Sequence, residues 1–279
     1  MPPPTTSLLA PDALSGHVVL LTGATGPVGR ATARALASAR AHLLLHYHAH
    51  PEIAQALRDE LASSVLALLP ADLTRPSAPE ALLSAASAYS FPSAIVNATA
   101  LFLPDSAPDA DLARMRALNL DAPLALLRAF AEHSTPPRPS RACVIHLLDS
   151  RIASPTPLPS FAAYHATKRT LTDSIPADAR RLAPLGIRVL GIAPGPLTLP
   201  PGIHAPAGPR PLANTPLTPA DVANTITFAL AAPALTGQIL YVDAGQHLAL
   251  SSSLPTTSEN SFPYNGNMFS TPEHPQIQQ

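Results

Sequence analysis

Two side chains in the sequence form a pair that could transfer protons. Tyr164 and Lys168 stand four residues apart, in Tyr164-His165-Ala166-Thr167-Lys168, and share one face if the segment is helical. A neighbouring cation favours the phenolate, so the tyrosine could pass a proton to a developing alkoxide or amide, while the ammonium could bind a ribose. The same spacing also occurs on solvated helix faces, so the surrounding motifs have to decide between the two interpretations.

A glycine-rich turn, residues 22–29 (TGATGPVG), follows the first expected strand and opens the first expected helix. In this context glycines permit a tight turn, and backbone N–H groups at the helix N-terminus can bind a pyrophosphate. An ordinary strand-to-helix turn is the alternative. The residues of the turn that we expect to contact a dinucleotide are Gly23, Thr25, Pro27, Val28 and Gly29.

About twenty residues on, where an acid would hold the adenosine ribose of NAD, the chain reads His46-Tyr47-His48-Ala49-His50. Without an acid nothing repels a 2′-phosphate, and His48 or His50 could donate hydrogen bonds to one. The sequence therefore favours NADPH over NADH, with His46, Tyr47 and His48 as contacts. Surface histidines after a strand are the alternative, and no acid or cysteine accompanies them to suggest a metal site.

Asp72 follows the third expected strand, in Ala71-Asp72-Leu73-Thr74. Its carboxylate could accept a hydrogen bond from an adenine amino group, with Leu73 beside it. It could equally cap the next helix.

Apolar segments of strand length alternate with segments that can present an apolar stripe at helical spacing. The expected strands are 17–21, 41–46, 65–68, 94–97, 142–148, 188–192 and 239–242, and the expected helices are 28–38, 52–62, 79–88, 109–133, 164–182 and 219–230. This alternation predicts an α/β fold with a doubly wound, mostly parallel sheet of about seven strands, and ligands beyond the carboxyl ends of its strands.

Composition limits the function further. The 279 residues are 46% hydrophobic and 13% charged with a formal net charge of −1, which suits one large domain and leaves no basic stripe for nucleic acid. The single cysteine, Cys143, cannot form an internal disulfide. No signal peptide or run of about 18 apolar residues is evident, so we expect a soluble cytoplasmic protein without a membrane partner.

We expect residues 1–15 to form a flexible segment and residues 16–250 to form the domain. Residues 251–279 are rich in Ser, Pro, Asn and Gln and are expected to be a disordered tail. The proline-rich residues 196–216 are expected to form a preformed, apolar substrate lid, or else a linker of drifted sequence.

The order and spacing of these motifs resemble the short-chain dehydrogenase/reductase family over roughly residues 16–250. The motifs that carry the resemblance are the glycine-rich turn, Asp72, Asn97, Asn119, Tyr164-x-x-x-Lys168, Pro194-Gly195, and residues 236–245 with Thr236-Gly237-Gln238 and Val242-Asp243-Ala244-Gly245. The resemblance implies a Rossmann-type sheet, a nicotinamide cofactor also contacted by Asn97, Ala98, Lys168, Pro194 and Gly195, and a proton relay of Asn119, Tyr164 and Lys168.

The chain is more closely similar to the pteridine reductase branch. It shares the His-Tyr-His after the second strand, Phe102 after the fourth strand, and Asp149 where most relatives have a catalytic Ser. The resemblance implies that Asp149 and Tyr164 deliver a proton, that Lys168 orients the ribose, and that Phe102 stacks on a flat substrate. Asp149 could instead cap the strand end, with Ser150 as the catalytic hydroxyl, and Phe102 could be a core aromatic.

Several positions depart from the family pattern. Pro27 removes a backbone donor from the phosphate-binding turn, Ala98 replaces an asparagine, and Ala49 stands where the branch has an arginine. Pro176 lies in the helix of Tyr164, where it should remove one backbone hydrogen bond and kink the helix. That helix often forms a dimer interface in the family, so the resemblance implies a homo-oligomer, either a dimer or a tetramer. Pro176 would weaken the interface of the usual tetramer.

The leading hypothesis is an NADPH-dependent reductase of a carbonyl or C=N bond in a small, flat substrate, either pterin-like or a ketone of secondary metabolism. A redox-neutral isomerase, cyclase or dehydratase with the same acid and base is the alternative. A non-catalytic cofactor-sensing or interaction protein is the third, against which the intact Asn119, Tyr164 and Lys168 argue.

Overall fold

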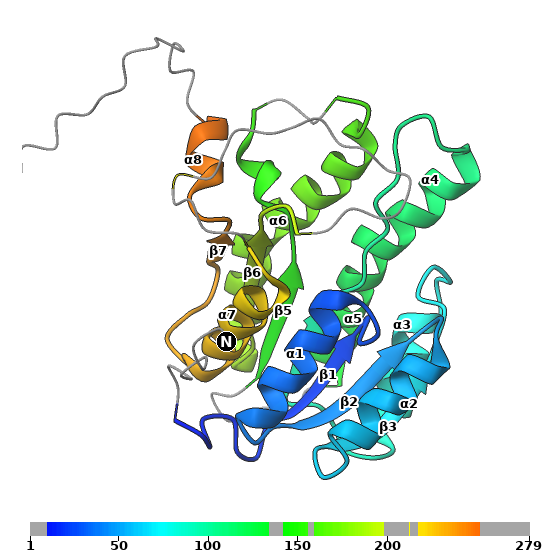
Figure 1. The fold of residues 1–279 in the computed structure, drawn as a ribbon, viewed down its shortest axis with the longest axis vertical. Helices are drawn as coiled ribbons and strands as arrows, with labels where there is room; N and C mark the ends of the chain where they lie inside the picture. Colours follow the sequence, from blue (N-terminus) through cyan, green and yellow to red (C-terminus); the bar gives the residue numbers. More distant parts are fainter. Residues whose placement is uncertain (1–9, 134–141, 156–158, 198–211, 213–216, 252–279) are drawn as a thin grey trace, which may run out of the picture.

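The computed structural model describes residues 10–133, 142–155, 159–197, 212 and 217–251. Its centre is one sheet of seven parallel strands in the order β3-β2-β1-β4-β5-β6-β7, with helices on both faces (Figure 1). The strands are β1 Val18–Thr22, β2 His42–Tyr47, β3 Val65–Pro70, β4 Ala94–Asn97, β5 Cys143–Leu147, β6 Arg188–Pro194 and β7 Ile239–Val242. This order confirms the predicted doubly wound α/β fold, whose chain reverses its direction of winding between β1 and β4.

The longer helices are α1 Pro27–Ser38, α2 Pro51–Glu60, α3 Ala78–Ser87, α4 Asp109–Arg116, α5 Ala122–Glu132, α6 Ala162–Leu182 and α7 Pro219–Ala231, followed by the short α8 Gln246–Ser251. All of the longer helices except α4 bury an apolar stripe against the sheet, whereas α4 packs against the turn η1 (Ala117–Asp121) and against α6. Leu36 of α1, Leu57 of α2 and Ile226 of α7 belong to one core cluster. Helices α3, α5 and α6 contribute to the cluster on the other face. The sheet is therefore covered by two separate apolar layers, as its continuous Val/Ile/Leu strands require.

The segment 109–133, expected as one helix, is divided. A π-helical turn, η1 Ala117–Asp121, separates α4 from α5, and Asn119 lies within it. Single π turns are often found at functional sites because they redirect a side chain and its neighbours. By contrast α6 continues as one helix through Pro176 to Leu182.

Residues 10–15, which we expected to belong to a flexible segment, form turns, and the Leu14 side chain is fully buried. The backbone N–H of Leu14 donates to the Ala39 carbonyl at the end of α1. The tail expected after residue 251 and most of the expected lid at 196–216 lie outside the described residues.

A buried arginine joins the sheet to the end of α7. Arg188, at the start of β6, is 6% exposed. Its Nη1 donates to the carbonyls of Ala229, Ala232 and Leu235, and its Nη2 donates to that of Leu230, all at 2.9–3.1 Å. The cation thus binds the unpaired carbonyls and the negative end of the helix dipole.

In the described part of the chain, no helix combines the length and the apolar character needed to cross a membrane.

Candidate active site

The site lies beyond the carboxyl ends of β4 and β5, where Tyr164 of α6 meets Asp149. The Tyr164 hydroxyl donates to Asp149 Oδ2 at 3.0 Å. The other oxygen of Asp149 accepts the backbone N–H of Arg151 at 2.9 Å, which caps the short 3-10 helix η2 Ser150–Ala153. One carboxylate oxygen of Asp149 therefore forms the expected cap, while the other faces the tyrosine. Its part in proton delivery stays a prediction.

Burial and the facing carboxylate determine the protonation of the tyrosine. The Tyr164 side chain is 9% exposed. Burial first, then the negative charge and the hydrogen bond of Asp149, raise the pKa of Tyr164 well above its ordinary value. Lys168 is not among the causes of this shift, and its expected effect on the phenolate stays a prediction. The direction of the shift corresponds to a neutral Tyr164 hydroxyl at pH 7.

Lys168 lies one helical turn after Tyr164 and is 2% exposed. Its Nζ donates to the Leu147 carbonyl at the end of β5, at 2.8 Å. Burial lowers the pKa of Lys168 to about 8, with the charge of Asp149 acting in the opposite direction. The ammonium is therefore fixed at the strand end beneath the tyrosine and remains mainly charged at neutral pH.

Aromatic rings form a wall beside the tyrosine. Phe102, in the loop after β4, stacks on Phe161 with ring centroids 4.5 Å apart and planes 5° apart. It also meets the Tyr164 ring edge-on, at 4.7 Å and 87°. Phe161 was not singled out in the sequence, although it precedes Tyr164 by one helical turn and shares its face. Stacked and edge-on rings of this kind hold each other in place.

Asn119 fixes the loop that carries this wall. Its Oδ1 accepts the backbone N–H of Leu101, and its Nδ2 donates to the Leu101 carbonyl, both at 2.8 Å. The side chain is fully buried. In this structure Asn119 is therefore a clamp that joins η1 to the residue before Phe102.

Two further polar groups are buried near the end of β5. The Ser150 hydroxyl is buried and has no hydrogen-bond partner among the described residues, whereas the neighbouring Asp149 accepts the hydrogen bond from Tyr164. His146 is fully buried, and its Nδ1 lies 3.2 Å from Asn97 Nδ2. Burial lowers the pKa of His146 to about 4, so the ring is neutral at pH 7. The amide of Asn97 is thereby used to join β4 to β5.

The glycine-rich turn after β1 is tightly packed. Gly23 has a φ of +69°, and a Cβ on Gly29 would lie 2.1 Å from the Gly23 carbonyl oxygen. Pro27 is the first residue of α1, after the N-cap residue Gly26, which makes no side-chain cap. Proline suits this position, where its missing N–H would be unpaired within the helix. Pro27 therefore removes only one backbone N–H donor from the turn.

His46 has a structural role that the sequence did not predict. It is 1% exposed. Its Nδ1 accepts the Gly23 backbone N–H at 3.2 Å, and its Nε2 faces the Ala71 carbonyl at 3.1 Å. Burial lowers the pKa of His46 to about 4. The neutral ring links the ends of β1, β2 and β3, so both of its nitrogens bind backbone groups.

A cleft of about 250 Å³ lies between the glycine-rich turn, the loops after β2, β3 and β4, and helix α4. Many of the expected cofactor contacts share this cleft; its lining includes Gly23, Thr25, His46, His48, Asp72, Leu73 and Ala98. The carboxylate of Asp72 accepts the backbone N–H and hydroxyl of Thr74, and these bonds lower its pKa. Asp72 thus makes a local turn and still borders the cleft.

Other expected contacts do not line this cleft: Pro27, Val28, Gly29, Tyr47, Asn97, Lys168, Pro194 and Gly195. His50 precedes α2 with a left-handed backbone, and its Nδ1 pairs with Glu52 at 3.1 Å. Gly195 follows β6, where its N–H donates to the Val242 carbonyl; an added Cβ would lie 2.9 Å from the Asp243 side chain.

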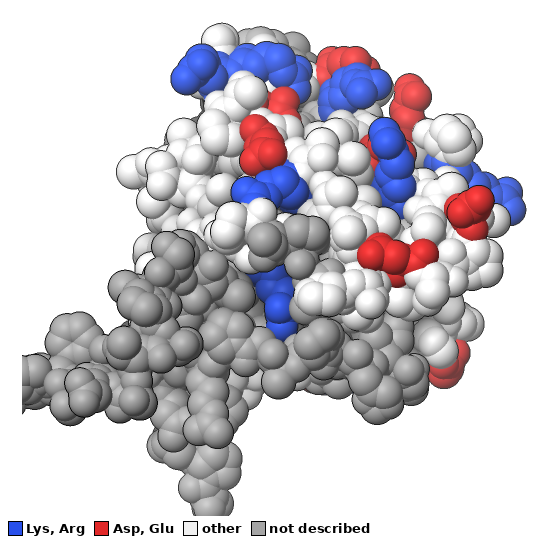
Figure 2. All heavy atoms as spheres, turned by 90° about the horizontal axis from the view of Figure 1, so that it is seen from above, with Lys and Arg blue, Asp and Glu red and all other residues white. Residues whose placement is uncertain are grey.

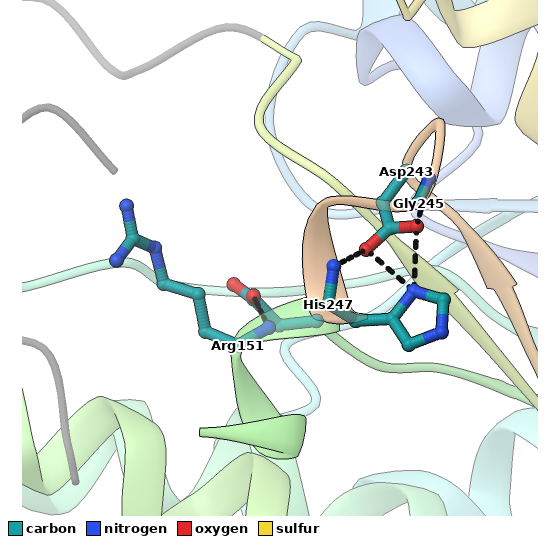
Figure 3. A network of polar contacts seen from close by, with 5 residues as sticks. Arg151, Asp243, Gly245 and His247 are labelled. Atoms are coloured by element: carbon teal, nitrogen blue, oxygen red, sulfur yellow. Dashed lines mark hydrogen bonds and ion pairs between the residues drawn. The ribbon is translucent and has the colours of Figure 1, made fainter. Parts of the chain in front are cut away.

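The last strand and α8 form a polar network beside η2 (Figure 3). The Asp243 carboxylate, 1% exposed, accepts the backbone N–H groups of Gly245 and His247 and contacts His247 Nδ1 at 2.9 Å. The His247 ring stacks on Tyr241. In Figure 3 the guanidinium of Arg151 points away from this network. The network fixes α8 against η2, which begins beside Asp149.

Charged side chains of both signs are interspersed over the described part of the face in Figure 2. Among the described residues, no group of three or more His, Cys, Asp or Glu side chains is arranged to hold a metal ion.

Comparison with known families agrees with this architecture. Residues 23–247 match the family described as enoyl-(acyl carrier protein) reductase, a profile of the short-chain dehydrogenases/reductases. The chain belongs to the short-chain dehydrogenase/reductase family. It is thus an oxidoreductase of a family that binds NAD(P) and acts on small molecules. The match extends from the glycine-rich turn to α8 but does not place this reductase in the pteridine branch. No curated protein matches the chain.

Proposed function

We propose that this short-chain dehydrogenase/reductase is an NADPH-dependent reductase of a carbonyl or C=N bond in a small, flat organic molecule. The observation that carries the proposal is the Tyr164 hydroxyl, protonated and hydrogen-bonded to Asp149 beside the wall of Phe102 and Phe161. Nicotinamide cofactors supply hydride. The protein has to supply the proton, and Tyr164 is the group placed to do so.

Proton transfer from Tyr164 leaves a phenolate in a buried site. The Lys168 ammonium, 2% exposed and fixed at the Leu147 carbonyl, provides the compensating positive charge. Asp149 accepts from the tyrosine before the reaction and so orients the hydroxyl. Its negative charge also keeps the proton on Tyr164 until a more basic oxygen or nitrogen develops on the substrate.

We infer a flat substrate from the stacked rings of Phe102 and Phe161. Phe102 is partly buried and packs against both Phe161 and Tyr164, so its position is fixed before a ligand binds. Aromatic rings favour offset stacking with planar groups. A pterin-like heterocycle and an aromatic ketone of secondary metabolism both fit this requirement.

The residues present fit a dinucleotide. The first turn of α1 has no side-chain cap, which leaves backbone donors of Val28 and Gly29 for a phosphate. Asp72 and Leu73 border the adenosine end, and exposed His48 can donate to a 2′-phosphate. The ammonium of Lys168 is placed to hold the nicotinamide ribose. Because residues 46–50 contain no Glu or Asp and include His48, we propose NADPH over NADH.

A redox-neutral isomerase, cyclase or dehydratase remains the second candidate, and one observation favours it. The Gly23 N–H is used by His46 and Pro27 has none, so the turn offers fewer phosphate donors than the motif suggests. Deuteride transfer from labelled NADPH distinguishes the two candidates, because only a reductase places the label in its product.

The test of the proposed function is oxidation of NADPH by the full chain, screened against pterins, cyclic imines and aromatic ketones. Tyr164→Phe should abolish turnover with the accepted substrate yet leave NADPH affinity within about twofold, since it removes the proton but keeps the ring. Unchanged turnover in this variant would refute the assignment of Tyr164.

We also propose a homo-oligomer, dimer or tetramer. An apolar groove between α4 and α6, lined in part by Leu112, Met115, Ala163 and Ala166, is a candidate contact surface. Light scattering of the purified chain measures the oligomeric state directly.

A further inference from the structure

A cation on helix α4 borders the adenosine end of the cofactor cleft. Arg114 lines the same cleft as Thr25, His48 and Asp72, although it belongs to a helix far along the chain from the loop after β2. No sequence motif marks Arg114 as a cofactor contact, because only the fold brings α4 beside the carboxyl ends of β1, β2 and β3.

The charges of this cleft need such a cation. Among the described residues that line it, Arg114 is the only lysine or arginine. Asp72 contributes a carboxylate whose pKa is lowered by its bonds to Thr74, so it is ionised at neutral pH. It is faced by Arg75, which does not line the cleft and whose Nε lies 3.6 Å from Asp72 Oδ2. A phosphate monoester adds close to two further negative charges, which is more than the single His48 side chain could compensate.

Arg114 is also able to change partners. Its Nη1 lies 3.4 Å from Asp111 Oδ1 on the same helix, and the two side chains are 56% and 44% exposed. Exposed pairs of this length contribute little to stability. A guanidinium binds a phosphate through two parallel hydrogen bonds, which are shorter and stronger than this contact.

We propose that Arg114 determines the preference of this reductase for NADPH by pairing with the 2′-phosphate of the adenosine ribose, alongside His48. The inference rests on the proposed function, which requires NADPH. It also accounts for Ala49, which stands where the resemblance led us to expect an arginine: the cation comes from α4 instead of the loop after β2.

The experiment measures binding of two fragments that lack nicotinamide, adenosine 2′,5′-bisphosphate and adenosine 5′-monophosphate, by isothermal titration calorimetry. The proteins are the wild type, Arg114→Met, Arg114→Lys and the matched control Arg116→Met. Arg116 is on the same helix and equally charged, but it lines the groove between α4 and α6 and pairs with Asp121.

Arg114→Met should weaken binding of the bisphosphate at least about tenfold, the effect of losing hydrogen bonds to a charged group. Binding of the monophosphate should change by less than about twofold, Arg114→Lys should restore part of the loss, and Arg116→Met should match the wild type. Added salt should weaken bisphosphate binding more steeply in the wild type than in Arg114→Met.

An equal loss for both fragments, or the same loss in Arg116→Met, overturns the inference. If the wild type prefers the bisphosphate and Arg114→Met keeps that preference, the inference fails while the proposed function stands. If the wild type does not prefer the bisphosphate, the proposed NADPH specificity fails, and the inference fails with it.

Discussion

Gly29 offers a sharp test of the cofactor turn, because its neighbours leave no room for a side chain. A Cβ at this position would lie 2.1 Å from the Gly23 carbonyl oxygen and 2.9 Å from the Ala24 Cα. Real Cβ contacts essentially never fall below 3.0 Å, so in Gly29→Ala the Gly23 carbonyl would have to retreat by about 1 Å. Gly23 cannot move freely, since its backbone is left-handed and its N–H is bonded to His46.

Forcing one methyl group into such a site costs about 1–3 kcal/mol. For a domain of this size each kcal/mol lowers the melting temperature by about 2–4 °C, so Gly29→Ala should melt about 2–12 °C below the wild type. The displaced turn should also weaken NADPH binding, because the Val28 and Gly29 N–H groups would no longer converge on one phosphate.

Gly26→Ala is the matched control for this prediction. Gly26 lies three residues earlier in the same turn, its φ is −71°, and the nearest atom to an added Cβ is the Gly23 oxygen at an ordinary 3.5 Å. Scanning calorimetry of the three proteins, with and without NADPH, measures both effects. The packing described for this turn would be refuted if Gly29→Ala had the same melting temperature and the same NADPH affinity as Gly26→Ala.

Three further predictions concern the buried polar groups. Arg188→Met removes the side-chain donors of four carbonyls at and after the end of α7 and should lower the free energy of unfolding in urea by about 3–5 kcal/mol. A loss below about 1 kcal/mol would contradict the role of this arginine. His46 and His146 have folded pKa values of about 4, below the ordinary 6.5, so the unfolded chain binds more protons between these values. Stability should therefore be complete above pH 6.5 and fall by about 2 kcal/mol per histidine between pH 7 and pH 5; a flat profile would contradict neutral, buried rings. Asp149→Asn removes a charge that raises the Tyr164 pKa, so ultraviolet titration should show one tyrosine ionising at lower pH than in the wild type, and an unchanged titration would count against the contact.

The alternating pattern of the sequence predicted the sheet well, because strands buried on both faces must be continuous apolar runs. The predicted strands 94–97 and 239–242 coincide with β4 and β7, and the others differ mainly by a residue or two at their ends.

The sequence could not show how buried polar groups are paired. The π turn at Asn119 depends on its bonds to Leu101, and such a contact has no local signature. The sequence predicted His46 as a cofactor contact in a cluster of three histidines. In the structure its ring instead contacts the Gly23 N–H after β1 and the Ala71 carbonyl after β3. The shift in the Tyr164 pKa likewise depends on Asp149, fifteen residues earlier in the chain.

The α8 helix was missed for a different reason. Its residues 246–251 are few and lead into a segment of low periodicity, so helical spacing could not be recognised. What stabilises it is the Asp243 carboxylate, which binds the first N–H groups of α8 and the His247 ring. By contrast, Phe161 could have been found, because it stands one helical turn before Tyr164.

The central claim is that the cleft lined by Gly23, His48 and Asp72 binds NADPH. Thermal unfolding of the wild type and Tyr164→Phe in the presence of NADPH or NADH tests it most directly. At a hundredfold excess over its dissociation constant, NADPH should stabilise both proteins by about 2.7 kcal/mol, which raises the melting temperature by about 5–10 °C. NADH at the same concentration should give a smaller rise. No shift with either nucleotide would contradict the account.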